Sequence, residues 1–185
     1  MYAARRFNVQ NLDSESDEKR FSVKVTCGGQ PLKDLDCDRV SAVEEQVMYW
    51  RKASHIHSWF VDNVQCGKDD CAAYRVSEYK LRELFSVCQK VIEASKLVDG
   101  TVYAGRIPSL GDSKPVGLRA PGRVIEDPTV AKRLLPTREG FFFGSTEYDE
   151  GYLDDVKDTH DWAARMLSDL DTATVANSIV YSSSW

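Results

Sequence analysis

A dense group of chemically active side chains occupies residues 49–60, in the stretch YWRKASHIHSWF. It combines aromatic rings, two cations and two of the chain's three histidines. Side chains of these types stack on aromatic ligands, pair with anions or transfer protons. If the segments that carry them pack together, His57 and His160 would supply the base and the acid of a phosphodiesterase-type hydrolase.

A second candidate site is the stretch GFFFGST, residues 140–146. Gly144, Ser145 and Thr146 stand where a predicted strand passes into a predicted helix. Backbone N–H groups and hydroxyls at a helix N-terminus form a seat for an anion or a phosphate. The spacing is not that of a P-loop, because it lacks GxxxxGK[ST] and no lysine follows the turn. A helix cap without a ligand is the alternative interpretation.

The cysteines and acidic residues give no metal-binding pattern. Cys66 and Cys71, in CGKDDC, are close enough in sequence to chelate zinc together, but no second pair accompanies them. Five cysteines without a repeated C-x-x-C favour reduced thiols in a cytosolic protein. We therefore expect neither a metal nor a cofactor.

Helical patterns predict three elements that would position these side chains. Ser41-Ala-Val-Glu44 is a capping-box signature, which predicts a helix from Ser41 to about Val64. A second helix is predicted from near Ser77, and a third just after Asp149, where Thr146-x-x-Asp149 is a capping-box variant. The second and third helices carry clear apolar stripes.

The helix predicted from Ser41 divides the opening stretch into two faces. Trp50 and His57 fall in the apolar stripe, so we expect them at the core or lining a pocket at its edge. Met48, His55 and Trp59 fall on the opposite face. Apolar groups there predict a surface that contacts another chain, in a homo-oligomer, or packs under a loop.

Strand patterns are weaker. Alternation predicts a strand over Arg20–Cys27, and Arg6–Val9 is a candidate for an earlier one. Phe141–Phe143 predicts a short buried strand, and the tail VANSIVYSSSW a candidate edge strand. Residues 100–128 hold five of the eleven glycines and four of the six prolines. They predict one long basic loop, either a solvated insertion or a lid over an anionic ligand.

Together these elements predict one compact α+β domain over residues 1–185, with about three helices packed on a small, mainly antiparallel sheet. The formal net charge of −5 argues against general binding to nucleic acids or anionic membranes. No run approaches the ~20 apolar residues of a membrane span. The N-terminus lacks the apolar segment of a signal peptide, so we expect an intracellular location.

Two long stretches, YWRKASHIHSWFVDNVQCGKDDC and LLPTREGFFFGSTEYDEGYLDD, resemble those of a family of small proteins encoded by tailed bacteriophages. The resemblance covers positions 40–160. The family's pattern has Asn where this chain has Ser54, and a small residue where it has His55. The resemblance implies a setting in the host cytoplasm and no particular chemistry.

For that setting our leading hypothesis is a binding protein that sequesters a small phosphorylated ligand, such as a nucleotide signal released by host defence. The residues that would contact it are aromatic, cationic or hydroxyl-bearing: Trp50, Arg51, Lys52, His57, Arg138, Phe143, Ser145, Thr146 and Tyr148. Two alternatives stay open. One is a hydrolase that uses His57 and His160, and the other is an inhibitor that binds a host protein through the face of Met48 and Trp59.

Overall fold

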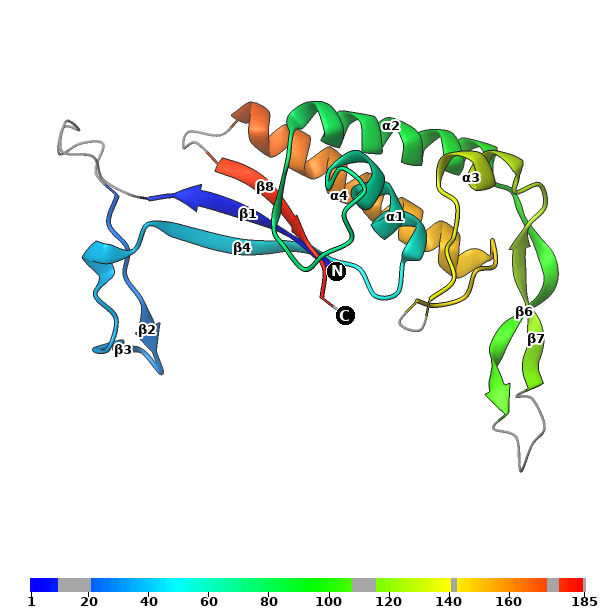
Figure 1. Ribbon diagram of the computed structural model, residues 1–185, viewed down its shortest axis with the longest axis horizontal. Coiled ribbons are helices and arrows are strands. Elements are labelled where there is room, and N and C mark those ends of the chain that lie inside the picture. The colour runs from blue at the N-terminus through cyan, green and yellow to red at the C-terminus, as the bar shows by residue number, and fades with distance from the viewer. Residues whose placement is uncertain (10–20, 108–115, 141–142, 173–176, 185) are drawn as a thin grey trace.

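A four-stranded antiparallel sheet forms the centre of the fold, with the strand order β4–β1–β8–β5. β1 (Tyr2–Asn8) lies between β4 (Ala42–Tyr49) and β8 (Asn177–Ser182), and β5 (Tyr74–Val76) forms the other edge. The first and last strands of the sequence are therefore direct neighbours (Figure 1). The computed structural model describes residues 1–9, 21–107, 116–140, 143–172 and 177–184.

Three substantial helices pack against this sheet around a shared apolar core (Figure 1). They are α1 (Ser54–Asn63), α2 (Glu78–Ala94) and α4 (Glu150–Thr172), and the short α3 (Thr129–Leu134) packs on α2. The predicted α+β class, with about three main helices and antiparallel sheets, is confirmed. None of the helices in the described ranges is long and apolar enough to cross a membrane.

The second and third predicted helices are confirmed as α2 and α4. Ser77 caps α2, because its hydroxyl accepts a hydrogen bond from the Lys80 N–H at 3.2 Å. Asp149 caps α4 in the same way, accepting from the Tyr152 N–H at 2.9 Å. The predicted apolar stripe of α2 contributes Leu81, Leu84, Cys88 and Val91 to the core. Local signals were sufficient here because cap and stripe lie within each helix.

The predicted helix over residues 41–64 is wrong, because its first half is the strand β4. Every residue of β1 has a partner in β4, from Tyr2 opposite Tyr49 to Asn8 opposite Ala42. Two ion pairs, Arg5–Glu45 and Arg6–Glu44, join the same strands. Pairing with a distant strand therefore overrides the local capping-box signature. The helix α1 begins only at Ser54.

This change of structure removes the predicted partner face. His55 and Trp59 are only 3% and 6% exposed, so neither can form a surface that another chain contacts. Met48 lies on β4 instead, partly buried against the core. Eight of the ten residues of α1 are buried, which means that this helix has almost no solvent face.

The predicted loop at residues 100–128 is, for the most part, a long hairpin. β6 (Leu97–Ile107) pairs antiparallel with β7 (Val116–Ile125), and the hairpin extends away from the helices (Figure 1). Residues 108–115 lie outside the described ranges. The prediction of an irregular loop is therefore wrong for the paired residues of β6 and β7.

Two glycines of this hairpin misled the prediction, because they are strand residues. A Cβ atom at Gly122 would lie 2.6 Å from Val102 Cγ2, and one at Gly100 would lie 2.8 Å from Val124 Cγ2. Each glycine thus makes room for a branched side chain across the ladder. Pro121 is tolerated because a two-stranded ribbon leaves one side of each strand unpaired.

The remaining strand predictions are partly correct. β1 confirms the early strand, but in the described part of 20–27 only β2 (Thr26–Cys27) pairs, with β3 (Gln30–Pro31). A short 3₁₀ helix, η2 (Cys37–Arg39), follows. The tail forms β8, which lies inside the sheet and not at its edge. Residues 141–142 lie outside the described ranges, and Phe143 is not in a strand.

Candidate functional site

Trp50 is a core residue and not a stacking platform. It is 2% exposed, and its ring packs edge-on against Trp162 at 5.2 Å and lies 5.5 Å from Phe60. Its indole N–H donates a hydrogen bond to the Thr159 hydroxyl at 2.8 Å, which joins the end of β4 to α4. A ligand could reach this ring only by displacing the core.

His57 is also buried, and both of its ring nitrogens have partners. Nδ1 lies 2.7 Å from the Tyr181 hydroxyl, and Nε2 lies 3.2 Å from a carboxylate oxygen of Asp69. Burial lowers the pKa of His57, while Asp69 raises it by a smaller amount. Burial also raises the pKa of Tyr181, so its hydroxyl stays protonated and donates to Nδ1. This arrangement fixes the tautomer that carries its proton on Nε2.

His160 lies in different surroundings. Its Nε2 is 2.7 Å from Gln89 Oε1, and its ring stacks on Phe85 at 4.5 Å, so it joins α4 to α2. His57 instead joins α1 to β8 through Tyr181. The predicted acid–base pair is therefore not assembled by these contacts.

Contacts at the start of α1 bring together four predicted site residues: Lys52, His57, Arg138 and Phe143. The Gly144 N–H donates to the Lys52 carbonyl at 3.3 Å, and the Arg138 N–H donates to the Ser54 hydroxyl at 3.1 Å. These two bonds hold Arg138 and Gly144 at the start of α1, and the ring of Phe143 lies 5.6 Å from the His57 ring. Arg51 and Lys52 are exposed at this surface. The guanidinium of Arg138, however, is already paired with Asp62 at 2.7 Å.

The prediction that Gly144, Ser145 and Thr146 form an anion-binding site at a helix N-terminus is wrong. Helix α4 starts four residues beyond Thr146, and the carboxylate of Asp149 already accepts a hydrogen bond from its first turn. The Ser145 hydroxyl accepts from the Glu147 N–H, and Tyr148 accepts from the Thr137 N–H at 3.2 Å. The Ser145 and Tyr148 hydroxyls are therefore engaged in hydrogen bonds within the chain.

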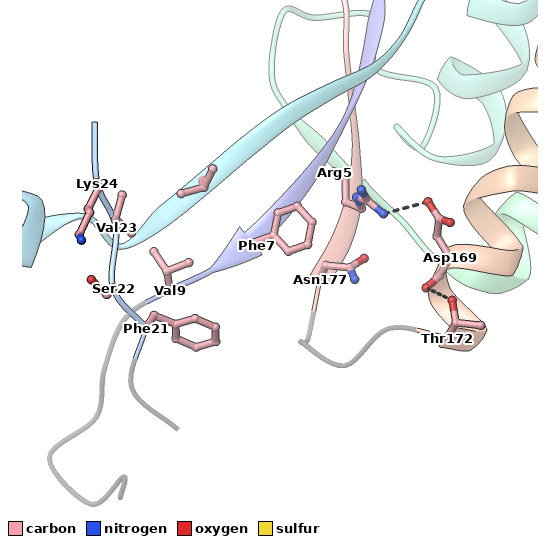
Figure 2. Close-up of a pocket in the computed structure, with 11 residues that line it drawn as sticks. Arg5, Phe7, Val9, Phe21, Ser22, Val23, Lys24, Asp169, Thr172 and Asn177 are labelled. Carbon is pink, nitrogen blue, oxygen red and sulfur yellow. Dashed lines mark hydrogen bonds and ion pairs between the residues drawn. The ribbon is translucent and has the colours of Figure 1, made fainter. Parts of the chain in front are cut away.

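A separate cavity lies between the sheet and the C-terminal end of α4. Its volume is about 590 Å³. It is lined by side chains from β1, from residues 21–24, from β4, from α4 and from β8 (Figure 2): Arg5, Phe7, Val9, Phe21, Ser22, Val23, Lys24, Val43, Asp169, Thr172 and Asn177. Figure 2 shows the rings of Phe7 and Phe21 both pointing from their segments toward the end of α4.

The two cations of this cavity differ in their charge balance. Arg5 donates to Asp169 at 2.9 Å and to Glu45 at 2.6 Å, and its guanidinium lies 5.0 Å from the centre of the Phe7 ring. Its charge is therefore compensated, and it ties β1 to β4 and α4. Lys24 has no carboxylate within ion-pair distance among the described residues, so its charge is available at the rim.

Sequence reasoning missed this cavity. A signal was present, since Phe7 and Phe21 each lie next to a basic residue in a stretch that predicts a strand. Only the three-dimensional structure brings the two stretches together beside α4. Within the same described ranges, no group of three or more His, Cys, Asp or Glu residues could hold a metal ion.

Comparisons with protein-family models, with curated proteins and with solved structures found no match for this chain. The geometry of the chain's own residues therefore carries the functional argument.

Proposed function

We propose that the protein binds a small phosphorylated ligand with an aromatic ring, of the nucleotide class, in the cavity between β1 and α4. The observation that carries this proposal is a cavity of about 590 Å³ with two phenylalanine rings in its lining. Protein cavities that bind small molecules have volumes of ~300–1,000 Å³ and mostly apolar linings with a few polar groups. The apolar residues Phe7, Val9, Phe21, Val23 and Val43 supply such a lining.

The polar groups of the cavity suit the two ends of a nucleotide. A base would stack on the phenylalanine rings, and the Asn177 amide lies in the same lining. The phosphate would face Lys24, because the charge of Arg5 is already balanced by two carboxylates. In this arrangement the phosphate would lie at the solvent side of the cavity.

The lining supports binding without turnover. Asp169 is the single carboxylate among its described residues, and it is paired with Arg5, so it is poorly placed to act as a general base. The three histidines do not line the cavity. The resemblance to bacteriophage proteins supports a biological role in which a host-defence nucleotide is sequestered in the host cytoplasm.

Binding and turnover are separated by one experiment. The protein is equilibrated with a panel of mononucleotides, dinucleotides and cyclic nucleotides, then denatured by heat, and the released ligand is analysed by mass spectrometry. Recovery of an intact nucleotide supports the proposal, whereas an altered nucleotide supports the hydrolase. If no nucleotide is retained by folded protein, the proposal is wrong. Light scattering on the same samples tests the predicted homo-oligomer.

Substitutions in the lining test the location. Phe7→Leu and Phe21→Leu keep apolar volume but remove the rings, and each should weaken binding about tenfold, since stacking of a base contributes roughly 1–3 kcal/mol. Lys24→Gln should weaken binding most at low salt. Lys90→Gln, an exposed lysine on α2, is the matched control and should change nothing. Equal affinities in all four variants would place the ligand elsewhere.

A further inference from the structure

A second concavity, of about 410 Å³, lies on the face of the sheet that turns away from the first cavity. Side chains alternate between the two faces of a strand, so Arg5 and Phe7 of β1 line the first cavity, while Arg6 and Asn8 line the second. The other lining residues are small or polar, with one more arginine: Ser41, Ala42, Arg75, Asn177 and Ser178. Among the residues that the structure describes, this lining contains no aromatic ring.

Two arginines approach this concavity from opposite sides of β8. Arg6 on β1 is the direct partner of Ser178, and Arg75 on β5 is the direct partner of Val180. Direct partners in an antiparallel ladder point to the same face, as do residues two apart on one strand. The strand spacing and rise place the two arginine Cα atoms about 12 Å apart. Two extended arginine side chains can span that gap and meet one anion above Ser178.

The charges of these arginines are only weakly compensated. Arg6 approaches Glu44 at 3.6 Å, which is an ion pair without the geometry of a close hydrogen bond. Arg75 is exposed, and in the described part of the chain no carboxylate or other acceptor pairs with its guanidinium. A positive concavity is therefore present on a protein whose formal net charge is −5.

We propose that this concavity binds the phosphoryl group of a small ligand between Arg6 and Arg75, with the Ser178 hydroxyl as a further donor. Guanidinium groups bind phosphate oxygens in pairs of parallel hydrogen bonds, and a doubly charged phosphoryl group balances two arginines. Single-stranded nucleic acids bind through bases that stack on aromatic side chains. The guanidiniums are the only planar cationic groups in the described lining, and no aromatic ring accompanies them. A small phosphate therefore fits this site better than a nucleic acid. The site is separate from the nucleotide cavity and does not depend on it.

The test measures binding of pyrophosphate and of ribose 5-phosphate by calorimetry to the full chain. Arg6→Gln and Arg75→Gln should each weaken binding of the preferred probe tenfold or more. Arg165→Gln removes an exposed arginine of α4 and is the matched control, which should keep the affinity of the unaltered protein. Thermal melting of each variant verifies that the chain is folded, and tighter binding of one probe distinguishes a free phosphate from a phosphate ester.

Three results with the two phosphate probes would overturn the proposal. They are the absence of binding of either probe by the unaltered protein, equal affinity in the Arg75→Gln variant, and equal losses in the Arg75→Gln and Arg165→Gln variants. Tighter retention of a single-stranded RNA oligonucleotide than of pyrophosphate would also overturn it in favour of a nucleic-acid surface. Phe7→Leu should leave phosphate binding intact, which separates the failure of this site from the failure of the nucleotide cavity.

Discussion

Replacing His55 with glutamine should change how the stability of the protein responds to acid. His55 is 3% exposed, and its ring lies 4.3 Å from the ring of Tyr152. Its Nε2 atom is buried without a hydrogen-bond partner among the described residues. Burial lowers the pKa of His55 from 6.5 to about 3. The folded protein therefore keeps this imidazole neutral well into the acidic range.

The sign of the effect follows from the two pKa values of His55. Between pH 6.5 and about 3 the unfolded chain binds a proton at His55 and the folded chain does not. The stability that the neutral His55 allows is therefore fully present above pH 6.5. Below pH 6.5 the free energy of unfolding falls as the pH decreases, because the unfolded chain takes up the proton. The slope approaches about 1.4 kcal/mol per pH unit, and the loss from pH 7.5 to pH 5.0 is about 2 kcal/mol.

Asp155 has the opposite effect on the free energy of unfolding as the pH falls. Burial, followed by the charges of Asp158, Asp154 and Asp149, raises its pKa from 3.8 to about 7. The folded chain binds this proton first, so the free energy of unfolding increases as the pH falls from 7 toward 3.8. The full shift would contribute about 2.5 kcal/mol between pH 7.5 and 5.0, which solvent screening of this partly exposed group reduces to about 1–2 kcal/mol. The unaltered protein should therefore show little net change from these two groups.

Urea unfolding at pH 7.5 and pH 5.0 tests whether His55 and Asp155 change the free energy of unfolding in opposite directions. The His55→Gln variant should gain about 2 kcal/mol of unfolding free energy relative to the unaltered protein when the pH is lowered, whatever its stability at pH 7.5. Asp155→Asn should instead lose stability on acidification. His160→Gln controls for the removal of a histidine as such. If His55→Gln and the unaltered protein respond equally to acid, the linkage assigned to His55 is wrong.

Three further outcomes follow from the packing. Trp50→Phe removes the buried bond to Thr159 and should lower the free energy of unfolding by about 1–3 kcal/mol in urea titrations, and an unchanged value would show that this bond contributes nothing. Ser77→Ala removes the cap of α2 and should cost about 1 kcal/mol, whereas Ser22→Ala, at an uncapped exposed position, should cost far less. In the native protein a thiol reagent should modify the exposed Cys27, Cys66 and Cys71 within minutes. Cys88 should react only after denaturation, because burial raises its pKa to about 12, and rapid native labelling of Cys88 by peptide mapping would contradict the core packing.

The elements that the sequence predicts well are those whose signals are local. Ser77 and Asp149 cap helices within one turn, and the stripes of α2 and α4 repeat along each helix. A helix-like signature begins at Ser41, just before β4, yet β4 is a strand because β1 pairs with it from Ala42 to Tyr49, with one register shift. The hairpin is rich in glycine for a reason that only the opposite strand reveals, namely the branched side chains of Val102 and Val124.

The candidate sites show the same limit more strongly. Trp50 and His57 are buried as predicted, but Trp50 lies outside α1, and the same helical periodicity placed the buried Trp59 on the solvent face. The sequence also could not show that Thr159 and Tyr181 would be the hydrogen-bond partners of Trp50 and His57. The lining of the cavity between β1 and α4 comes from five segments that are distant in sequence. No short motif encodes such an arrangement, because each segment contributes only one to four of the side chains.

The register of β1 decides which arginine serves which face of the sheet. Arg5 and Arg6 are adjacent, so a shift of one residue would exchange their faces. Arg5 is bound by Asp169 of α4 and by Glu45 of β4, which holds it on the helix side. That clamp uses the charge of Arg5 for structure and leaves Arg6 on the opposite face with a looser partner. The ion pairs of Arg5 therefore fix the register that places Arg6 on the same face of the sheet as Arg75, where both can bind an anion.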